Sequence, residues 1–253
     1  MSAPSEAAMR RLVDIARRAG DAIMSWYGNG AVVTTKTDGS PLTSADRAAH
    51  DLIERELTTW DPAVPVISEE GRIPAAAERS GWQKFWLVDP LDGTKEFINR
   101  NGEFTVNIAL IERGDPVLGV VHAPALGRCW YAARGFGAWS ESAPGQPVRI
   151  HSASAAPGAP LTVVESRSHP SARLESYLAT IPVARRVQAG SSLKICLVAE
   201  GTADIYPRFG PTMEWDVAAG DCIFRNSGRD SPRISPLRYN KPDLRNGDFI
   251  LGA

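Results

Sequence analysis

The chain has few cysteines, no long apolar run and almost no net charge. Its three cysteines lie far apart, without the spacing of a zinc site or a disulfide framework, which favours a reducing compartment. No apolar run is long enough to cross a bilayer, and the first twenty residues lack the apolar core of a signal peptide. A formal net charge of −1 argues against bulk binding to nucleic acid polymers or anionic membranes. We therefore expect a globular cytoplasmic protein without an integral membrane segment.

The charge is divided unevenly along the 253 residues. Residues 1–145 contain 15 Lys and Arg against 19 Asp and Glu, whereas residues 146–253 contain 13 against 10. A stretch rich in Ser, Ala, Gly and Pro at 142–160 marks a domain boundary. We predict an N-terminal α+β metal-binding half, 1–145, and a C-terminal α/β substrate-binding half, 146–253. The charge difference is either chance or the sign of an acidic half that holds cations beside a basic half that holds an anion.

Apolar periodicity predicts alternating helices and strands. Residues 6–27 read as an amphipathic helix that ends at Gly28, and Ser44 is expected to cap a second helix. The segments "VPVISEE" and "KFWLVDP" read as short strands that end in acids, and a hairpin is expected over 104–124. After residue 160 the pattern is strand, helix, strand, helix, strand, and then a helix from about residue 215. This alternation predicts the α/β fold class.

Acidic residues gather where these elements end. Glu69 and Glu70 close one strand, Asp89 and Asp92 close the next, and Asp216 begins the late helix. Two like charges at ~4 Å repel by roughly 1–4 kcal/mol, which a bound cation would reverse. Mg²⁺ is typically held by a few carboxylates together with water and a substrate phosphate. The alternative is that these acids only shape turns and cap helices.

The segment "DPLDGT", 89–94, has the composition of a turn that faces a ligand. Pro90 and Gly93 favour a turn, so that the two acids and the carbonyl of Leu91 can point at one position. The backbone N–H groups of Gly93 and Thr94 are then available to a phosphate.

Taken together, "DPLDGT", the "EE" at 69–70 and "EWDVAAGD" at 214–221 are similar to the Mg²⁺-dependent, lithium-sensitive phosphatases of the inositol monophosphatase superfamily. The resemblance covers nearly the whole chain. It implies a layered α/β/α/β/α sandwich, two or three Mg²⁺ in each active site, and inhibition by Li⁺. Carried over residue by residue, it implies the metal ligands Glu69, Asp89, the Leu91 carbonyl, Asp92 and Asp216.

The segment "KTDGSPLTSAD", 36–46, resembles the 3′(2′),5′-bisphosphate nucleotidase branch of that superfamily. This resemblance implies that Asp38 works with Thr94 to orient and deprotonate the attacking water. Glu70 is expected to assist catalysis by orienting Glu69 or the water. Taken alone, Asp38 is equally explained by an ordinary Asp-Gly turn.

The basic half resembles the nucleotide-binding stretches of the same branch at "SRSH", "GSSLKICLVAEG" and "YPRF". Lys and Arg suit a second phosphate, the one that is not cleaved. The resemblance implies that inositol-specific members carry an acid at the position of Phe209, which argues against free inositol phosphate. The predicted substrate-binding residues are Glu69, Leu91, Asp92, Gly93, Thr94, His169, Ser191, Ser192, Lys194, Arg208 and Asp216.

These resemblances predict a phosphomonoesterase that converts 3′-phosphoadenosine 5′-phosphate to AMP and phosphate, and that also accepts 3′-phosphoadenylyl sulfate. The alternatives are an inositol or other sugar phosphatase, and a non-catalytic sensor of phosphonucleotides. Retention of Asp38 and Thr94 speaks against the sensor, because a pure binder needs no group that activates water. The partner is thus a small bisphosphorylated nucleotide. The sequence leaves open a monomer or homodimer, and loose association with the inner face of the membrane.

Overall fold

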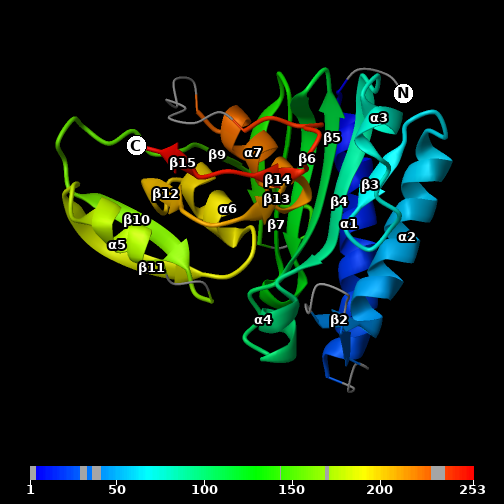
Figure 1. Cartoon of the computed structure of the whole chain (residues 1–253), viewed down its shortest axis with the longest axis horizontal. Coiled ribbons are helices and arrows are strands. Elements are labelled where there is room, and N and C mark those ends of the chain that lie inside the picture. The colour runs from blue at the N-terminus through cyan, green and yellow to red at the C-terminus, as the bar shows by residue number, and fades with distance from the viewer. Residues whose placement is uncertain (1–3, 29–32, 36–40, 143, 169–170, 229–236) are drawn as a thin grey trace.

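The protein is built from five layers, alternately helical and sheet (Figure 1). The computed structural model describes residues 4–28, 33–35, 41–142, 144–168, 171–228 and 237–253. Helices α1 and α2 cover a large sheet, α6 and α7 lie between that sheet and a smaller one, and α5 lies on the outside of the smaller sheet. The α/β/α/β/α sandwich predicted from the resemblance is therefore confirmed.

The large sheet has the strand order β3-β4-β5-β6-β7-β8-β9. Strands β3 and β4 are parallel and all other neighbours are antiparallel. The expected hairpin is confirmed as β5 and β6, and a 3₁₀ helix, η1 (Pro124–Leu126), joins β6 to β7. The strands are β3 (Val66–Ser68), β4 (Lys84–Asp92), β5 (Thr105–Glu112), β6 (Asp115–Ala123), β7 (Arg128–Ala133), β8 (Gly137–Glu141) and β9 (Val148–Ile150).

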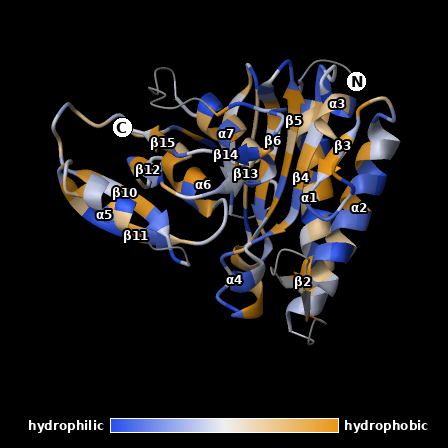
Figure 2. Ribbon diagram, in the orientation of Figure 1, coloured by the Kyte–Doolittle hydropathy of each residue, from blue (hydrophilic) through white to orange (hydrophobic). Residues whose placement is uncertain are grey.

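Two amphipathic helices cover one face of this sheet. Helix α1 (Glu6–Tyr27) has the predicted bounds and ends at Gly28. Helix α2 (Ser44–Trp60) is capped by Thr43, so the prediction of Ser44 as the cap is wrong by one residue. Thr43 has the extended backbone of an N-cap, and its hydroxyl accepts from the Ala45 and Asp46 amides at 3.2 and 3.4 Å. Figure 2 shows hydrophobic residues concentrated in the strands and the helical surfaces that cover them.

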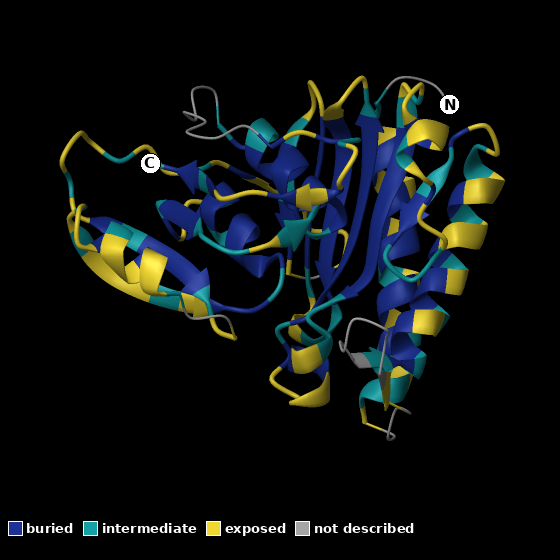
Figure 3. Ribbon diagram, viewed as in Figure 1, coloured by how far each residue is buried: buried dark blue, intermediate teal, exposed yellow. Residues whose placement is uncertain are grey.

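On the other face, α7 (Glu214–Asn226) lies directly on β5 and β6, and α6 (Leu193–Ala199) packs against α7. The approach is close because Gly119 of β6 has no side chain. A Cβ there would lie 2.9 Å from the Ala219 carbonyl oxygen of α7. Both the sheet and α7 are buried along most of their length (Figure 3).

The smaller sheet has the order β11-β10-β12-β15. Strands β10 (Leu161–Ser166), β11 (Val183–Ala189) and β12 (Ile205–Arg208) are parallel and confirm the predicted α/β pattern. Strand β15 (Phe249–Gly252) pairs antiparallel with β12 and was not expected, because four residues carry too little periodicity. The remaining short elements are α3 (Ala76–Arg79), α4 (Thr94–Ile98), α5 (Ala172–Leu178), and the paired strands β1 (Val33–Thr35) with β2 (Pro41–Thr43) and β13 (Thr212–Met213) with β14 (Arg245–Asn246).

One of the buried hydrophobic clusters spans the two predicted halves. Strand β9 lies beyond residue 145 and yet pairs with β8, and α7 from the second half packs on the first sheet. Phe85 and Trp130 of the large sheet belong to the same buried cluster as Phe224 and Phe249. The domain boundary at residue 145 stays a prediction. Among the described residues, no helix combines the length and apolar character needed to cross a membrane.

Candidate metal and phosphate site

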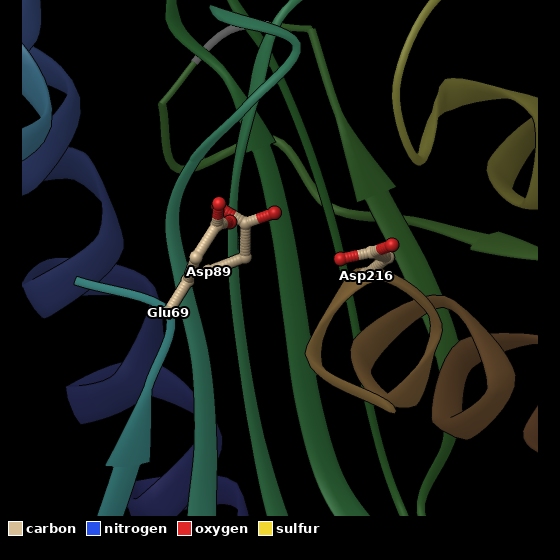
Figure 4. A group of neighbouring side chains, drawn as sticks. All are labelled: Glu69, Asp89 and Asp216. Atoms are coloured by element: carbon tan, nitrogen blue, oxygen red, sulfur yellow. The ribbon is translucent and has the colours of Figure 1, made fainter. Parts of the chain in front are cut away.

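Three acids from distant parts of the chain meet in one place (Figure 4). Glu69 follows β3, Asp89 lies in β4 and Asp216 lies in the first turn of α7. One carboxylate oxygen from each lies within 4.8 Å of the others. The fold thus brings together acids that the sequence places at the ends of separate elements.

The charge of this cluster is strongly opposed by its surroundings. Burial raises the pKa of Asp89 well above its usual range, and the nearby Glu69 and Asp92 raise it further. Burial and the charge of Asp92 raise the pKa of Asp216 in the same way. A divalent cation would remove this penalty, and an all-oxygen donor set is the one that Mg²⁺ prefers. The residues present therefore fit a hard divalent cation.

A β-bulge in β4 explains how Asp89 and Asp92 face the same cleft. Three residues apart, they would point to opposite faces of a regular strand. Asp89 pairs with Asn107 and Asp92 pairs with Thr105, so β4 has one residue more than β5 over this interval. The extra residue restores a common direction. The turn continues through Gly93, whose φ of +93° is the left-handed conformation that favours glycine.

The Thr94 hydroxyl is oriented by a buried carboxylate. It donates to Asp46 Oδ1 at 3.3 Å and lies 3.5 Å from the Leu91 carbonyl. Asp46 is fixed in turn because its other oxygen accepts from the Thr43 amide at 2.7 Å. Asp46 therefore completes the capping box of Thr43 at the start of α2 and also positions Thr94. Glu70 is not among the residues that line the cleft, and Asp38 lies outside the described residues.

Basic groups face the acids across an open cleft of about 440 Å³. Lys194 is buried, and its ammonium donates to the Ser191 carbonyl. Burial lowers the pKa of Lys194 to about 8, although the charge of Asp92 raises it. The ammonium also lies 5.7 Å from the ring centroid of Tyr206, which lines the same cleft.

Two donors at this end of the cleft have no partner among the described residues. Ser191 Oγ and Arg208 Nε are both buried and both lack a hydrogen bond. Ser191 also adopts φ of +41°, which is uncommon for a residue with a side chain. Buried donors without partners are rare in folded proteins, and an anion in the cleft would satisfy these two.

Ser192 joins the acidic and basic sides. It is 3% exposed, and its hydroxyl donates to the Asp216 carbonyl. The amide of Asn107 donates to Ser192 Oγ at 2.9 Å and to Asp92 Oδ2 at 3.2 Å. Asn107 was not predicted from the sequence. The available signal was a polar residue in the middle of the apolar strand "FTVNIALI".

Most of the predicted site comes together in this cleft, while His169 lies outside the described residues. Phe209 does not line the cleft, because its ring packs 5.4 Å from that of Tyr177. Lys95, Glu96 and Tyr206 line it and were not predicted. The predicted residues that line it are Glu69, Asp89, Leu91, Asp92, Gly93, Thr94, Ser191, Ser192, Lys194, Arg208 and Asp216.

A cleft between two sheets, with clustered carboxylates on one wall and the cationic side chains of Lys194 and Arg208 on the other, defines a protein that can bind a divalent metal and a phosphorylated small molecule. The sequence model of the "Inositol monophosphatase family" matches residues 6–251. The chain belongs to this family, as the sequence resemblance predicted, and enzymes of this family use Mg²⁺.

Individual relatives are similar over most of the chain. A Salmonella typhimurium protein named 3′(2′),5′-bisphosphate nucleotidase CysQ is 53% identical over 217 residues, covering 85% of this chain and 86% of its own. Its namesake from Escherichia coli K12 is 51% identical, with coverages of 86% and 87%. The crystal structure of CysQ from Bacteroides thetaiotaomicron has a TM-score of 0.84 and 42% identity, and covers 98% of this chain and 97% of its own.

Proposed function

We propose that this protein is a phosphomonoesterase that hydrolyses 3′-phosphoadenosine 5′-phosphate to AMP and phosphate, and that it also accepts 3′-phosphoadenylyl sulfate. The observation that carries the proposal is the pairing, in one cleft, of an acidic cluster with two cationic side chains and with two donors that lack a partner among the described residues. A substrate with two anionic groups would contact both walls, one group through metal ions at the acidic cluster and the other at the cationic side chains. The names of the relatives support the same reaction.

The carboxylates of Glu69, Asp89, Asp92 and Asp216, with the Leu91 carbonyl, are the proposed ligands of two or three Mg²⁺. When bound, Mg²⁺ would supply positive charge that stabilises the transferred phosphoryl group. Li⁺ is the expected inhibitor. The chain itself contributes oxygen donors that β4, its bulge and α7 hold in place.

The hydrolytic step needs an acceptor for the proton of the attacking water. The water oxygen forms a bond to phosphorus, the bond from phosphorus to the 3′ oxygen breaks, and that oxygen takes a proton from solvent water and leaves as a hydroxyl. In the proposal Asp38 accepts the proton of the water, and Thr94 orients the water through its hydroxyl. The contact from Thr94 to the buried Asp46 supports this role, because it keeps the hydroxyl pointed in one direction.

The second phosphate is proposed to lie against Lys194, Arg208 and Ser191, and His169 is a further predicted contact. Arg208 already donates to the Pro211 carbonyl at 3.1 Å, which holds its guanidinium in place and leaves Nε for a ligand. Charge-assisted hydrogen bonds to a phosphate are roughly twice as strong as neutral ones. This pocket would therefore set the preference for bisphosphorylated substrates.

The test is the release of phosphate, with Mg²⁺, from three substrates side by side: 3′-phosphoadenosine 5′-phosphate, inositol 1-phosphate and fructose 1,6-bisphosphate. The proposal expects the highest kcat/KM for the nucleotide. A higher kcat/KM for either sugar phosphate contradicts the proposal in favour of a sugar phosphatase. Tight binding of the nucleotide without turnover contradicts it in favour of a non-catalytic sensor.

A further inference from the structure

The turn that precedes α6, at Gly190 and Ser191, is held by one carboxylate from the other half of the chain. Glu103 lies in the loop between α4 and β5, and its Oε2 accepts from the Gly190 amide at 2.8 Å. Arg167 donates from Nε and a terminal nitrogen to the two oxygens of Glu103, both at 2.8 Å, and also to the Gln188 carbonyl at 3.1 Å. Glu103 thus joins the end of β10 to the turn after β11.

The contact leaves no spare room. A Cβ on Gly190 would lie 2.7 Å from the Glu103 carbonyl oxygen and 2.9 Å from Cγ of Glu96. The Glu96 carboxylate in turn accepts from the hydroxyl of Ser168, next to Arg167. The turn is therefore held between two acidic side chains of the first half.

Glu103 remains charged in this position. Burial raises its pKa, but the hydrogen bonds from Arg167 and from the Gly190 amide lower it more, so the net shift is downward. Bidentate pairs of this kind fix geometry as well as charge. The pair therefore acts as a rigid attachment for the backbone at Gly190.

The next residue is the one with the uncommon backbone. Ser191 lines the cleft and has φ of +41°; its hydroxyl has no hydrogen-bond partner among the described residues, and its carbonyl accepts from the Lys194 ammonium. Such conformations persist only where neighbouring contacts hold them. The attachment at Gly190 thus determines where the Ser191 hydroxyl and the Lys194 ammonium stand. Glu103 and Arg167 themselves are not among the residues that line the cleft.

We infer that Glu103 and Arg167 are positioning residues that determine the preference for substrates with a second phosphate. The inference rests on the proposed function and adds to it a specificity device that does not touch the substrate. Without the pair, we expect the turn to relax and the second phosphate to lose its aligned donors. The carboxylates proposed to bind the metal ions at the first phosphate should keep their positions.

The test uses Arg167→Met, Glu103→Gln and the double variant. For 3′-phosphoadenosine 5′-phosphate each single variant is expected to raise KM about tenfold, with a much smaller change in kcat. The inhibition constant of AMP, which carries the same 5′-phosphate, is expected to rise by a similar factor. The ratio of kcat/KM for the bisphosphate to that for 3′-AMP falls in parallel. The double variant loses no more than the larger single loss, because the two residues act as a unit.

The matched control is Arg186→Met. It removes another Arg, in β11, that pairs with two carboxylates, Glu165 of β10 and Glu175 of α5. All three kinetic quantities should stay at wild-type values in the control. If Glu103→Gln does not fold, Arg167→Met alone carries the test, because that side chain is 41% exposed.

A wild-type ratio in folded Arg167→Met overturns the inference and leaves the proposed function standing. A fall in kcat without a rise in KM also overturns it. If the wild type shows no preference for the bisphosphate over 3′-AMP, the proposed function fails, and the inference fails with it.

Discussion

At Asp89 the protein holds a charge that its surroundings oppose. The side chain is 2% exposed, and both burial and the neighbouring acids raise its pKa. A carboxylate in such a place costs folding free energy unless a cation compensates it. Asp89 thus lowers the stability of the metal-free fold at a position where a metal ion would bind. Its removal should therefore abolish activity without lowering stability.

The substitution Asp89→Asn is expected to abolish phosphate release and leave the fold intact. It removes a proposed ligand and one repulsive charge, so the melting temperature in EDTA should stay equal or rise slightly. Activity as a function of Mg²⁺ and thermal melting in EDTA measure the two effects. Asp248→Asn, at a surface pair with Arg173, is the control and should behave as wild type. Near-normal activity of Asp89→Asn at modest Mg²⁺ would contradict the assignment.

The substitution Thr94→Ala is expected to lower kcat by about 10²- to 10⁴-fold with little change in KM. The proposed role of the hydroxyl is to orient the attacking water, and Asp46 fixes its direction. Thr94→Ser keeps the hydroxyl and should recover much of the rate. Equal kcat values for the Ala and Ser variants would show that the hydroxyl has no part in the reaction.

Single elements are adapted to the contacts they make. The bulge in β4 turns two acids to one face, and Gly119 in β6 lets α7 approach the sheet. Strand β6 also carries His122. Its ring is buried, and its Nδ1 makes a hydrogen bond of 3.0 Å with the Arg128 carbonyl of β7. The carbonyl can only accept, so Nδ1 carries the hydrogen in this contact.

His122 is expected to make stability depend on pH. Burial lowers its pKa to about 4 from 6.5, although the hydrogen bond to Arg128 raises it. Between these values the unfolded chain binds a proton that the folded protein does not, so stability falls as the pH drops from 6.5 towards 4. Between pH 7.5 and 4.5, His122 should lower the free energy of unfolding by about 2–3 kcal/mol. Urea unfolding of wild type and His122→Asn at both pH values measures this: the pH-dependent loss of unfolding free energy should be smaller in the variant by that amount. If the pH-dependent change in unfolding free energy is the same in wild type and variant, a group other than His122 causes it.

At the scale of the whole molecule, the cleft exists because two sheets share the layer formed by α6 and α7. The acidic wall comes from the large sheet and the first turn of α7. The cationic wall comes from α6 and from β12, which contribute Lys194 and Arg208. In the proposed function a substrate with two phosphates would contact both walls, so substrate selectivity tests the relative placement of the two sheets.

Arg208→Ala is expected to raise KM for 3′-phosphoadenosine 5′-phosphate about ten- to a hundredfold. One charge-assisted contact is worth about 1.5–3 kcal/mol, and it is made alike in the ground and transition states, so kcat should change little. The measurement is kcat/KM for the bisphosphate and for 3′-AMP, in wild type and variant. Only the bisphosphate reaches the pocket, so the ratio should fall. A constant ratio would mean that Arg208 is not a phosphate contact.

The sequence by itself determined the features that depend on neighbouring residues. The periodicity of residues 6–27 predicted α1 with its end at Gly28, and the turn at Arg113–Pro116 predicted the β5–β6 hairpin. The acids at the ends of strands were visible as candidate ligands, because residue type and turn residues are written within a few positions.

Only the tertiary structure decided the contacts between residues far apart in the chain. Asn107 reaches Ser192 across 85 positions, and Glu103 reaches Arg167 and Gly190 across 64 and 87. The sequence contains each polar residue but not its partner, because a hydrogen bond forms only where the packed layers place a donor beside an acceptor. The same reason hid β15, a four-residue strand whose edge position exists only once β12 is in place.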